Sequence, residues 1–480
     1  MRIFRSTSSG VAIPTVALLL LLLAGLLVTT RLPAQSSSAA VAAPTAPVAS
    51  VSDDVLARGS YLADAGDCVA CHTRPDGAPY AGGRPLKTPF GTVLSANLTP
   101  DDATGIGRYT PDTFYRAMRK GRDHEGRHLY PAFPYNYFTR IARADSDALF
   151  AYLRSLPPVN NPLERNQLPF PFNIRALVWG WNLLFLDEGP YQPQPALSEQ
   201  WNRGAYLVQG LGHCGACHTP KNLFGAPKEE QSLRGGVFAN LFAPDITPNR
   251  RTGLGAWSRD ALIAFLRSGR NAHSAASAEM GEAVAFSTSR LRDADLEAIA
   301  TYLASVPAAP NEPVAQPAAA VMAQGRAIWQ DTCSACHQME GEGVPGLFPP
   351  LQANANLQQR NPDTVLHFIL AGTRSTPTAT APTPLSMPPF AWKLNDAQVA
   401  AVATYARNSW GNAAPAVTAQ QVADMRERLG ADGAMALQPP APEAGSMQRP
   451  GPNTLAPADT DSRDNGSAQA GRPVSAGSTP

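Results

Sequence analysis

The sequence predicts an all-α protein in which proline-rich linkers join three tandem domains. A chain of 480 residues is too long for one compact core. A Cys-x-x-Cys-His motif occurs three times and uses every cysteine of the chain. The segments around each motif also repeat, with the apolar spacing of amphipathic helices. The predicted domains cover residues 52–157, 198–307 and 320–411.

The surroundings of each motif recur in the same order along the chain. A predicted helix precedes every motif and reads ARGSYL, NRGAYL or AQGRAIW. The string TGIGRY at residues 104–109 matches TGLGAW at residues 252–257, and a glycine marks the end of the next helix in both copies. Closing helices are predicted at residues 151–157, 301–307 and 404–410, and proline ends the first two. Each motif therefore marks one helical domain.

The spacing Cys-x-x-Cys-His is the attachment signature of c-type haem. The two thiols form thioether bonds to the porphyrin, and the adjacent histidine supplies the proximal iron ligand. A zinc site would need a second cysteine pair close by, whereas these pairs lie far apart in the chain. The sequence thus predicts three covalently bound haem c groups in three class I cytochrome c domains. The attachment cysteines are Cys68, Cys71, Cys214, Cys217, Cys333 and Cys336, and the proximal histidines are His72, His218 and His337.

Methionine is a frequent second axial ligand in electron-transfer haems, where it raises the reduction potential. Met280 and Met387 each lie between a predicted middle helix and a closing helix. We expect these two residues to be the distal ligands of the second and third haems.

The first domain offers no methionine at the corresponding place. Its only methionine after the motif, Met118, falls at an apolar core position of a predicted helix. The loop that should supply the ligand reads HLYPAFPY, with Phe133 at its centre, and phenylalanine cannot bind iron. His124 or His128 could substitute, or the first haem could be five-coordinate.

The segments outside the three domains have distinct compositions. Residues 1–35 are predicted to be a signal peptide or N-terminal anchor, because arginines precede a long apolar run. Residues 36–51 and 308–319 are linkers, and residues 412–480 are predicted to be a disordered tail. The connecting segment 158–197 contains an apolar helix, which either packs between domains or forms a docking surface for a partner subunit or lipid. The folded part is expected outside the cytoplasm.

The charge balance excludes one large class of partner. The chain has 39 Lys and Arg residues against 38 Asp and Glu residues. A nearly neutral chain has no basic footprint for nucleic acid, so no such partner is expected.

Several longer strings resemble one protein family. The sequence is similar to the triple-haem cytochrome c subunit of membrane-bound bacterial dehydrogenases, which oxidise alcohols, aldehydes, gluconate or related polyols in the periplasm. The strings that carry the resemblance are AGGRPLKTPFG (81–91), NLTPD (97–101), LPFPFNIRALVWGWNLLF (168–185), SGRNAHSAAS (268–277) and MPPFAWKLND (387–396). The family reads YPAMPY where this chain has YPAFPY, so the resemblance also places Phe133 at a ligand position.

The resemblance implies an electron-transfer subunit on the periplasmic side of the bacterial cytoplasmic membrane. A separate catalytic subunit of the flavin, quinone-cofactor or molybdenum type would oxidise a CH–OH or aldehyde donor. Electrons would then pass through three haems to ubiquinone or another respiratory acceptor at the membrane surface. Two alternatives remain open from the residues: a free periplasmic electron carrier, and a peroxidase-like haem enzyme at the first haem.

Overall fold

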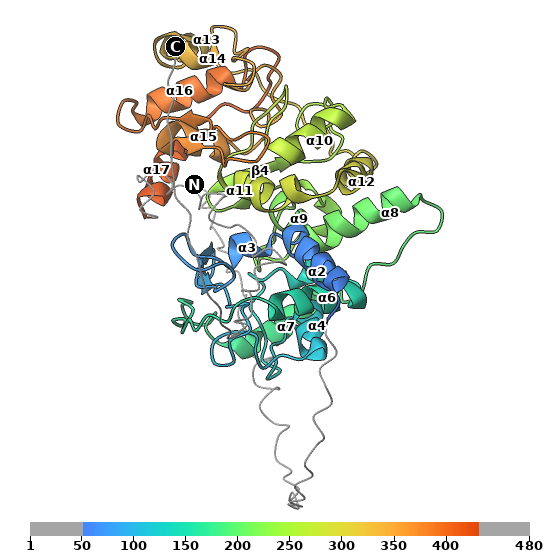
Figure 1. The fold of residues 1–480 in the computed structure, drawn as a ribbon. Helices are drawn as coiled ribbons and strands as arrows, with labels where there is room; N and C mark the ends of the chain where they lie inside the picture. Colours follow the sequence, from blue (N-terminus) through green and yellow to red (C-terminus); the bar gives the residue numbers. More distant parts are fainter. Residues whose placement is uncertain (1–50, 432–480) are drawn as a thin grey trace, which may run out of the picture. The chain divides into compact units, whose positions relative to one another are not determined.

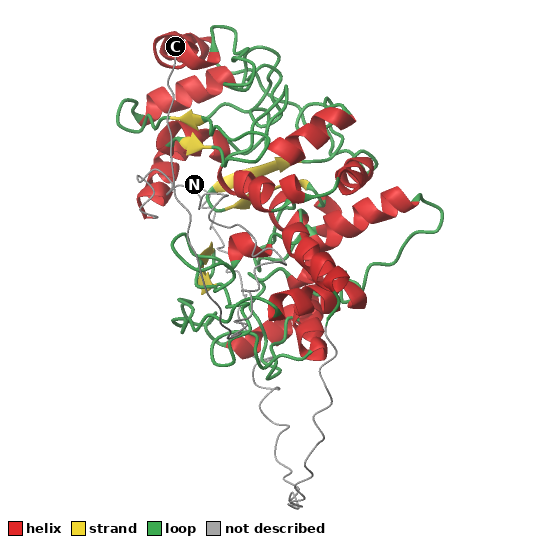
Figure 2. Cartoon of the chain, viewed as in Figure 1, coloured by secondary structure: helices red, strands yellow, loops and turns green. Residues whose placement is uncertain are grey.

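The computed structural model describes residues 51–431, in which helices predominate (Figures 1 and 2). The predicted export segment, residues 1–35, lies outside the described residues, as do residues 432–480. Between residues 51 and 431, no helix combines the length and the apolar character needed to cross a bilayer.

The first repeat, residues 52–157, begins and ends with long helices, and a single helical turn between them carries the first motif. Its elements are α2 (Asp53–Ala65), α3 (Cys68–Cys71), β1 (Pro85–Thr88), β2 (Gly91–Leu94), α4 (Pro111–Lys120), α5 (Tyr135–Phe138) and α6 (Arg143–Arg154). The connecting segment that follows contains a short 3-10 turn, η1 (Arg175–Leu177), and α7 (Val178–Phe185).

The second and third repeats follow the same plan. The elements of the second are α8 (Glu199–Tyr206), η2 (Leu207–Leu211), α9 (Gly215–His218), η3 (Glu229–Gln231), β3 (Arg234–Phe238), β4 (Leu241–Asp245), α10 (Arg259–Ser268), α11 (Ala278–Phe286), η4 (Thr288–Arg290) and α12 (Asp293–Leu303). Those of the third are α13 (Ala319–Ile328), η5 (Trp329–Cys333), α14 (Ser334–His337), α15 (Asp363–Ala371), β5 (Thr373–Arg374), β6 (Ser386–Met387) and α16 (Asp396–Ala406), with α17 (Ala419–Ala431) after it.

In every repeat the helix before the motif crosses the closing helix, so that α2 packs on α6, α8 on α12 and α13 on α16. A glycine lies at each crossing. A Cβ atom added to Gly59, Gly204 or Gly325 would lie 2.0, 2.0 or 2.3 Å from a carbonyl oxygen of the facing helix. Atoms in protein interiors are already in close contact, and no side chain fits into such a gap. The three sequence-matched glycines therefore hold the same structural position.

The middle helices are capped at both ends, and they end at the glycines that the sequence predicts. Thr110 caps α4, because its hydroxyl accepts the backbone N–H of Thr113, and Ser258 caps α10 in the same way. Gly121 ends α4 with φ 58°, and Gly269 ends α10 with φ 75°. These angles lie in the left-handed region that glycine adopts without steric cost.

The expected all-α fold needs one correction, because each repeat also contains a two-stranded antiparallel hairpin. β1 pairs with β2, β3 with β4, and β5 with β6. The strands are only two to five residues long. Apolar alternation over so few residues gives no recognisable period in a sequence.

The expectation of a disordered tail from residue 412 is wrong for its first part. α17 packs against α15 and α16. Its side chains Val422, Met425 and Leu429 follow helical spacing and are at most 5% exposed. Arg426 Nε also donates to Asp396 Oδ1 at 2.6 Å. Surroundings rich in alanine, proline and glycine concealed this short apolar pattern in the sequence.

The first two repeats share one hydrophobic core, whereas the third has its own. A single cluster of buried residues includes Leu62 and Leu149 of the first repeat together with Leu207 and Leu296 of the second. A separate cluster joins the buried faces of α15, α16 and α17. The sequence shows three similar repeats, but the first two pack as one unit.

A buried aspartate of the first repeat binds residues from both repeats. Asp145, at the start of α6, accepts hydrogen bonds from Arg58 Nε at 2.8 Å and from Tyr206 Oη at 2.6 Å. Arg58 belongs to the same repeat, whereas Tyr206 comes from α8 of the second repeat. Asp145 therefore links the helix pair of its own repeat to its neighbour.

The second repeat has the equivalent arrangement, with Asp295 at the start of α12. Asp295 accepts hydrogen bonds from Arg203 Nε at 2.7 Å and from Tyr61 Oη of the first repeat at 2.5 Å. The third repeat has Gln324 and Ala327 where the first two have the arginine and the tyrosine. The exchange of tyrosines is thus specific to the first two repeats.

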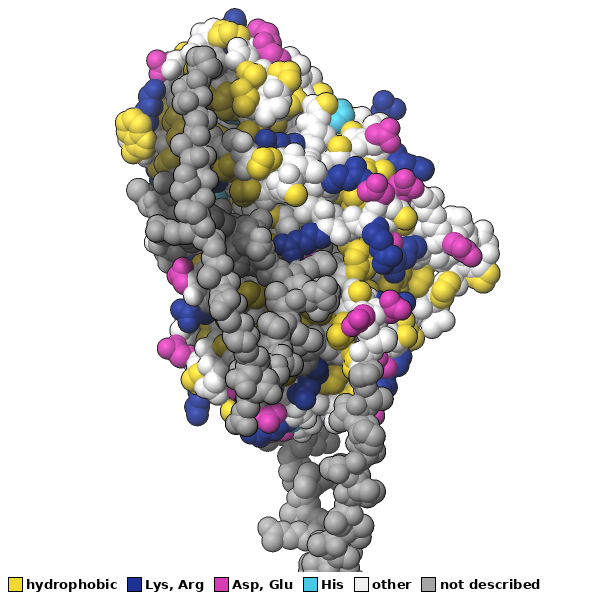
Figure 3. All heavy atoms as spheres, in the orientation of Figure 1, with side chains coloured by type: hydrophobic (Ala, Val, Ile, Leu, Met, Phe, Trp, Pro, Cys, Tyr) yellow, Lys and Arg dark blue, Asp and Glu magenta, His cyan; other side chains and the backbone are white. Residues whose placement is uncertain are grey.

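Charged side chains of both signs are interspersed on the face shown in Figure 3. No field of a single sign dominates the visible part of that face, which agrees with the near-equal counts of basic and acidic residues.

Candidate haem-binding sites

The first motif lies where the chain turns sharply after α2. α2 ends at Ala65, and Asp67 adopts a left-handed conformation with φ 51° before α3 begins. The turn is closed by the backbone N–H of His72, which donates to the Cys68 carbonyl oxygen at 3.0 Å. Cys68, Cys71 and His72 all line the same cavity. This arrangement brings two thiols and an imidazole to one site.

The second and third motifs are built on similar turns. The His218 N–H donates to the Cys214 carbonyl oxygen at 3.0 Å. The π-helical turns η2 and η5 lead into these two motifs. Such turns are rare and occur frequently at functional sites, where they adjust the direction of the following residues.

Two of the three motif histidines have their rings held by a backbone carbonyl. Nδ1 of His72 lies 2.7 Å from the Ala96 oxygen, and Nδ1 of His218 lies 2.7 Å from the Pro244 oxygen. A proton on Nδ1 leaves Nε2 as the free lone pair that can bind a metal. Burial lowers the pKa of both rings, which favours the neutral form that ligation requires. Nδ1 of His337 is buried without a hydrogen-bond partner among the described residues.

The six cysteines are free of disulfide bonds. Cys71 and Cys217 line the cavity, and burial raises the pKa of each thiol to about 12. Burial also raises the pKa of Cys214 to about 11. The paired cysteines are therefore available as free thiols, which attachment to the vinyl groups of a porphyrin requires.

A cavity of about 2520 Å³ opens beside the first motif and continues past Cys217 to Met387. Sites for ordinary small molecules occupy about 300–1,000 Å³, so this space suits larger groups. Its apolar wall near the first motif includes Leu98, Ile106, Phe114, Met118 and Phe133. Thiols, an imidazole and an apolar wall in one space fit a covalently attached porphyrin.

The predicted distal ligands lie in the expected segments. Met280 is in α11 and is half-buried against the shared core. Met387 is in β6 and lines the cavity. Met118 is in α4, is only 5% exposed, and packs in the core, as its apolar helix position predicts. The ligation of iron by Met280 and Met387 stays a prediction.

The first and second motifs lie close together. Cys71 and Cys217 line the same cavity. Arg84 of the first repeat donates to Glu282 Oε2 of the second at 2.8 Å. Burial raises the pKa of Glu279, which lines the same cavity, to about 7. The junction between the two motifs is thus built from both repeats.

Sequence reasoning missed the carbonyl groups of Ala96 and Pro244, which orient the histidine rings. A signal was present, because each precedes a segment of the form Asn/Asp-x-Thr-Pro. In the structure Asn97 Oδ1 accepts the Thr99 N–H at 2.9 Å. In the second repeat Asp245 Oδ1 accepts the Thr247 N–H in the same way. These turns hold the preceding carbonyl in place.

Comparison with known proteins agrees with this geometry. The model of the cytochrome c family matches residues 322–410, which include the third motif. A cytochrome c domain implies haem c that is bound covalently through the motif cysteines.

Curated relatives extend the similarity to most of the chain. A nicotinate dehydrogenase subunit of Pseudomonas putida is 42% identical over 81% of this chain, which spans 33% of that longer protein. The fructose dehydrogenase cytochrome subunit of Gluconobacter japonicus is 38% identical over 80% of this chain and 85% of its own length. The gluconate 2-dehydrogenase cytochrome c subunit of Pantoea cypripedii is 39% identical over 78% of this chain and 90% of its own length. This chain therefore belongs to the family of cytochrome c subunits of dehydrogenases.

Proposed function

We propose that the chain carries three haem c groups and passes electrons from a dehydrogenase catalytic subunit to a respiratory acceptor. The observation that carries the proposal is the Cys-x-x-Cys-His motif, which recurs on three similar turns, each beside a pair of crossed helices. When bound, haem c supplies an iron that alternates between the ferric and ferrous states and so holds one electron.

The residues of the chain hold and tune these groups. Six cysteines attach the porphyrins, and His72, His218 and His337 supply the proximal nitrogen. Met280 and Met387 supply a distal sulfur at the second and third sites. The proposal places each set in one class I cytochrome c domain, residues 52–157, 198–307 and 320–411. The three glycine crossings support this division.

Contacts between the repeats support electron transfer along the chain. Arg84 of the first repeat donates to Glu282 of the second, and Cys71 and Cys217 line the same cavity, which supports a short path between the first two sites. The second and third repeats meet where Thr364 Oγ1 accepts the Phe242 N–H at 2.8 Å and donates to the Phe242 oxygen at 2.9 Å. The cavity that passes from the first motif to Met387 is continuous with both junctions.

The names of the relatives suggest the partners, because they include fructose, gluconate and nicotinate dehydrogenases. We propose a catalytic subunit that oxidises a CH–OH or aldehyde donor with a flavin, quinone or molybdenum cofactor. The acceptor is ubiquinone or another respiratory carrier, and the site of action is the periplasmic side of the cytoplasmic membrane.

The central experiment measures haem content and reduction in the exported protein, purified together with its dehydrogenase partner. We expect three haems per chain by the pyridine haemochrome method, and reduction of the haems when the partner's substrate is added without oxygen. Replacing Cys214 and Cys217 together with alanine should lower the content to two, because the second site loses both thioether bonds.

The two readouts separate the parts of the proposal. Fewer than three haems in the unaltered protein would contradict the haem count. Three haems that no co-purified dehydrogenase reduces would contradict the partner assignment, and peroxide turnover by the isolated chain would favour a haem enzyme instead.

α7 offers a surface by which the chain can associate with the membrane. Leu183 and Leu184 are each 71% exposed and Trp179 is 59% exposed, while Val178 on the same helix is buried. Exposed tryptophan and leucine on a short helix are typical of segments that lie in the membrane interface. A helix packed between domains would account for Val178 but not for the leucines. We include the membrane surface among the partners on this ground.

Glutamate at both Leu183 and Leu184 should weaken vesicle binding at least about tenfold, because two apolar side chains no longer enter the lipid. The measurement is flotation with vesicles of neutral and anionic phospholipid. The protein tested begins at Val51, the start of the compact unit that contains all three motifs. Leu347→Glu, at a leucine that is 54% exposed on the third repeat, is the matched control. Equal flotation of all forms would exclude α7 as the attachment surface.

A further inference from the structure

The middle loops of the first and second repeats can be aligned by their hydrogen bonds. Gly121 and Gly269 end the equivalent helices α4 and α10 in the left-handed conformation. The Leu129 N–H donates to the Gly121 oxygen at 2.7 Å, and the Ala276 N–H donates to the Gly269 oxygen at 2.7 Å. Leu129 and Ala276 therefore hold equivalent positions, and four residues beyond them lie Phe133 and Met280, respectively.

His124 has a counterpart in the second repeat that is not at the ligand position. Its ring lies against Tyr109, with centroids 4.9 Å apart. The His273 ring stacks on Trp257, the residue that matches Tyr109, with centroids 5.5 Å apart. The second repeat thus contains this histidine in addition to Met280. We conclude that His124 forms part of the cavity wall beside the ring of Tyr109.

Met118 is also matched by a residue that does not bind metal. It lies three residues before Gly121, and Leu266 lies three residues before Gly269. The two side chains are 5% and 7% exposed and belong to the shared core. Because leucine has the same place in the second repeat, Met118 serves there as packing.

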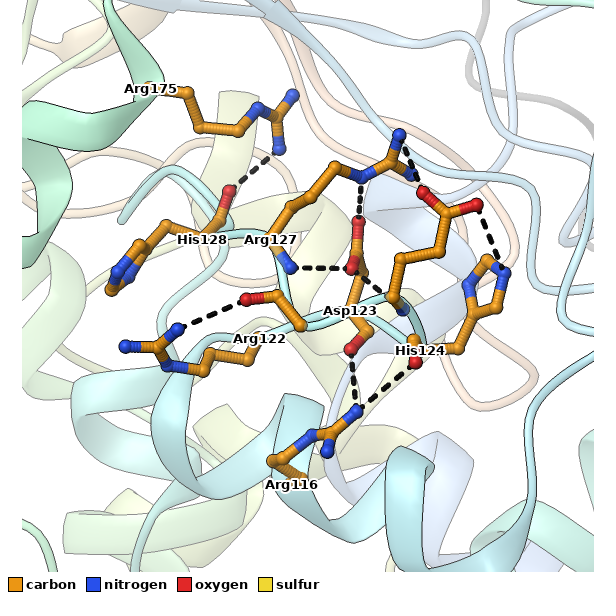
Figure 4. Close-up of polar contacts among 9 residues, drawn as sticks. Arg116, Arg122, Asp123, His124, Arg127, His128 and Arg175 are labelled. Carbon is orange, nitrogen blue, oxygen red and sulfur yellow. Dashed lines mark hydrogen bonds and ion pairs between the residues drawn. The ribbon is translucent and has the colours of Figure 1, made fainter. Parts of the chain in front are cut away.

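His128 is held through its backbone and does not line the cavity beside the first motif. Its backbone oxygen accepts Arg175 Nη1 at 2.7 Å, and it forms an antiparallel bridge with Arg122. Figure 4 shows the rings of His128 and His124 on opposite sides of the loop. Arg127 and Leu129, the neighbours of His128 in the chain, line the cavity, while His128 is absent from that wall in the described structure.

Phe133 itself is held in the ligand position by other aromatic rings. Its centroid is 5.3 Å from that of Phe138 and 6.3 Å from that of Tyr135, and its side chain lines the cavity. Tyr135 is fixed in turn, because its hydroxyl donates to Asn182 Oδ1 at 2.5 Å. The phenyl ring is therefore a stable wall that provides no electron pair to a metal.

We propose that Phe133 leaves the first haem five-coordinate and makes its distal side a binding site for a small neutral ligand such as carbon monoxide. The inference rests on the proposed function, since it requires a haem at Cys68 and Cys71. Carbon monoxide donates a lone pair to the ferrous iron at the vacant position, and no other bond breaks. The apolar wall of Phe133, Met118 and Phe114 favours an uncharged ligand over an anion.

The test uses the full exported chain with its haem content measured first. With three haems present, we expect about one third of the iron to be high-spin by magnetic circular dichroism, and one carbon monoxide bound per chain after reduction. Phe133→Met should convert that third to the low-spin form and abolish carbon monoxide binding. Phe133→Leu, which adds no ligand, should leave both signals unchanged.

Two further variants make the outcome decisive. Met280→Leu should give the second haem the character of the first, with two thirds of the iron high-spin and two carbon monoxide molecules bound. Replacing His124 and His128 together with alanine should leave the high-spin fraction unaltered. Three low-spin haems in the unaltered protein, with high-spin iron appearing only in the double histidine variant, would overturn the inference while leaving the haem count intact. Fewer than three haems would instead contradict the proposed function.

Discussion

Replacing Gly204 with alanine is expected to unfold the helix pair α8–α12 and to destabilise the protein by about 3 kcal/mol. The added Cβ would lie 2.0 Å from the Ala298 carbonyl oxygen and 2.8 Å from Cβ of Tyr302. The two nearest atoms belong to the backbone of Ala298 in α12 and cannot rotate away, so the helices must separate. Because α8 leads directly into the second motif, the variant should also lose the low-spin spectrum of the second haem. Guanidinium unfolding and visible spectroscopy measure the two effects.

Gly180→Ala is the matched control for this substitution. Gly180 also lies inside a helix, α7, but a Cβ atom there would meet nothing within 4 Å. Alanine is the better helix former by up to about 1 kcal/mol, so this variant should be as stable as the unaltered protein or slightly more stable. Equal stability of the Gly204 and Gly180 variants would show that the helix crossing tolerates a side chain and would contradict the packing argument.

Replacing Asp295 with alanine is expected to destabilise the protein by about 2–3 kcal/mol and to loosen the junction between the first two repeats. Asp295 is 7% exposed, and its loss leaves Arg203 and Tyr61 without their acceptor. Breaking a fully buried ion pair costs about 3–5 kcal/mol, and the smaller figure reflects the partial exposure of Arg203. Thermal unfolding and limited proteolysis between the repeats measure the effect.

The same interaction predicts a dependence on pH. Burial by itself would raise the pKa of Asp295, but the hydrogen bonds from Arg203 and Tyr61 outweigh it and hold the pKa below its ordinary value of 3.8. The contribution to stability is therefore complete above about pH 4 and is lost as the pH falls through the lowered pKa of the folded state. Asp295→Asn should lose stability less steeply than the unaltered protein between about pH 4 and pH 2.

An exposed ion pair between another aspartate of α12 and an arginine of α10 supplies the comparison. Asp293 and Arg267 form a pair at 2.5 Å, but the aspartate side chain is 78% exposed. Pairs of this kind contribute about 0–1 kcal/mol, so Asp293→Asn should leave the stability of the protein almost unchanged. If the Asp293 and Asp295 variants behaved alike, the reciprocal aspartates would have no special role at the junction.

The attachment chemistry could be predicted from the sequence because it is local. Two thiols and an imidazole within five residues form the attachment signature of haem c whatever surrounds them, so Cys214, Cys217 and His218 could be predicted from the sequence alone. The glycines that end α4 and α10 were equally readable, since a left-handed residue after a helix favours glycine. The same local register already placed Phe133 where a ligand was expected.

Contacts between distant residues decided the rest. Tyr61 and Asp295 lie 234 positions apart, and nothing in either segment indicates that they meet. The sequence left His124 and His128 as equal substitutes for a ligand. Only their surroundings distinguished them, because the His124 ring lies against Tyr109 while His128 does not line the cavity. The local sequence identifies which residues are candidate ligands. What each of their side chains contacts depends on the packing between helices.

By itself, then, the sequence determined the three Cys-x-x-Cys-His motifs that predict haem attachment, the repeat that surrounds them and the phenylalanine where a distal ligand was expected in the first repeat. Each of these features depends on residues that are only a few positions apart, where the geometry of the backbone allows few alternative arrangements. Only the tertiary structure decided that the first two repeats share one core, that α17 closes the third, and that each of two aspartates binds the tyrosine of the neighbouring repeat. These features arise from burial of apolar surface and of paired charges, which depends on how the whole chain packs rather than on any one segment.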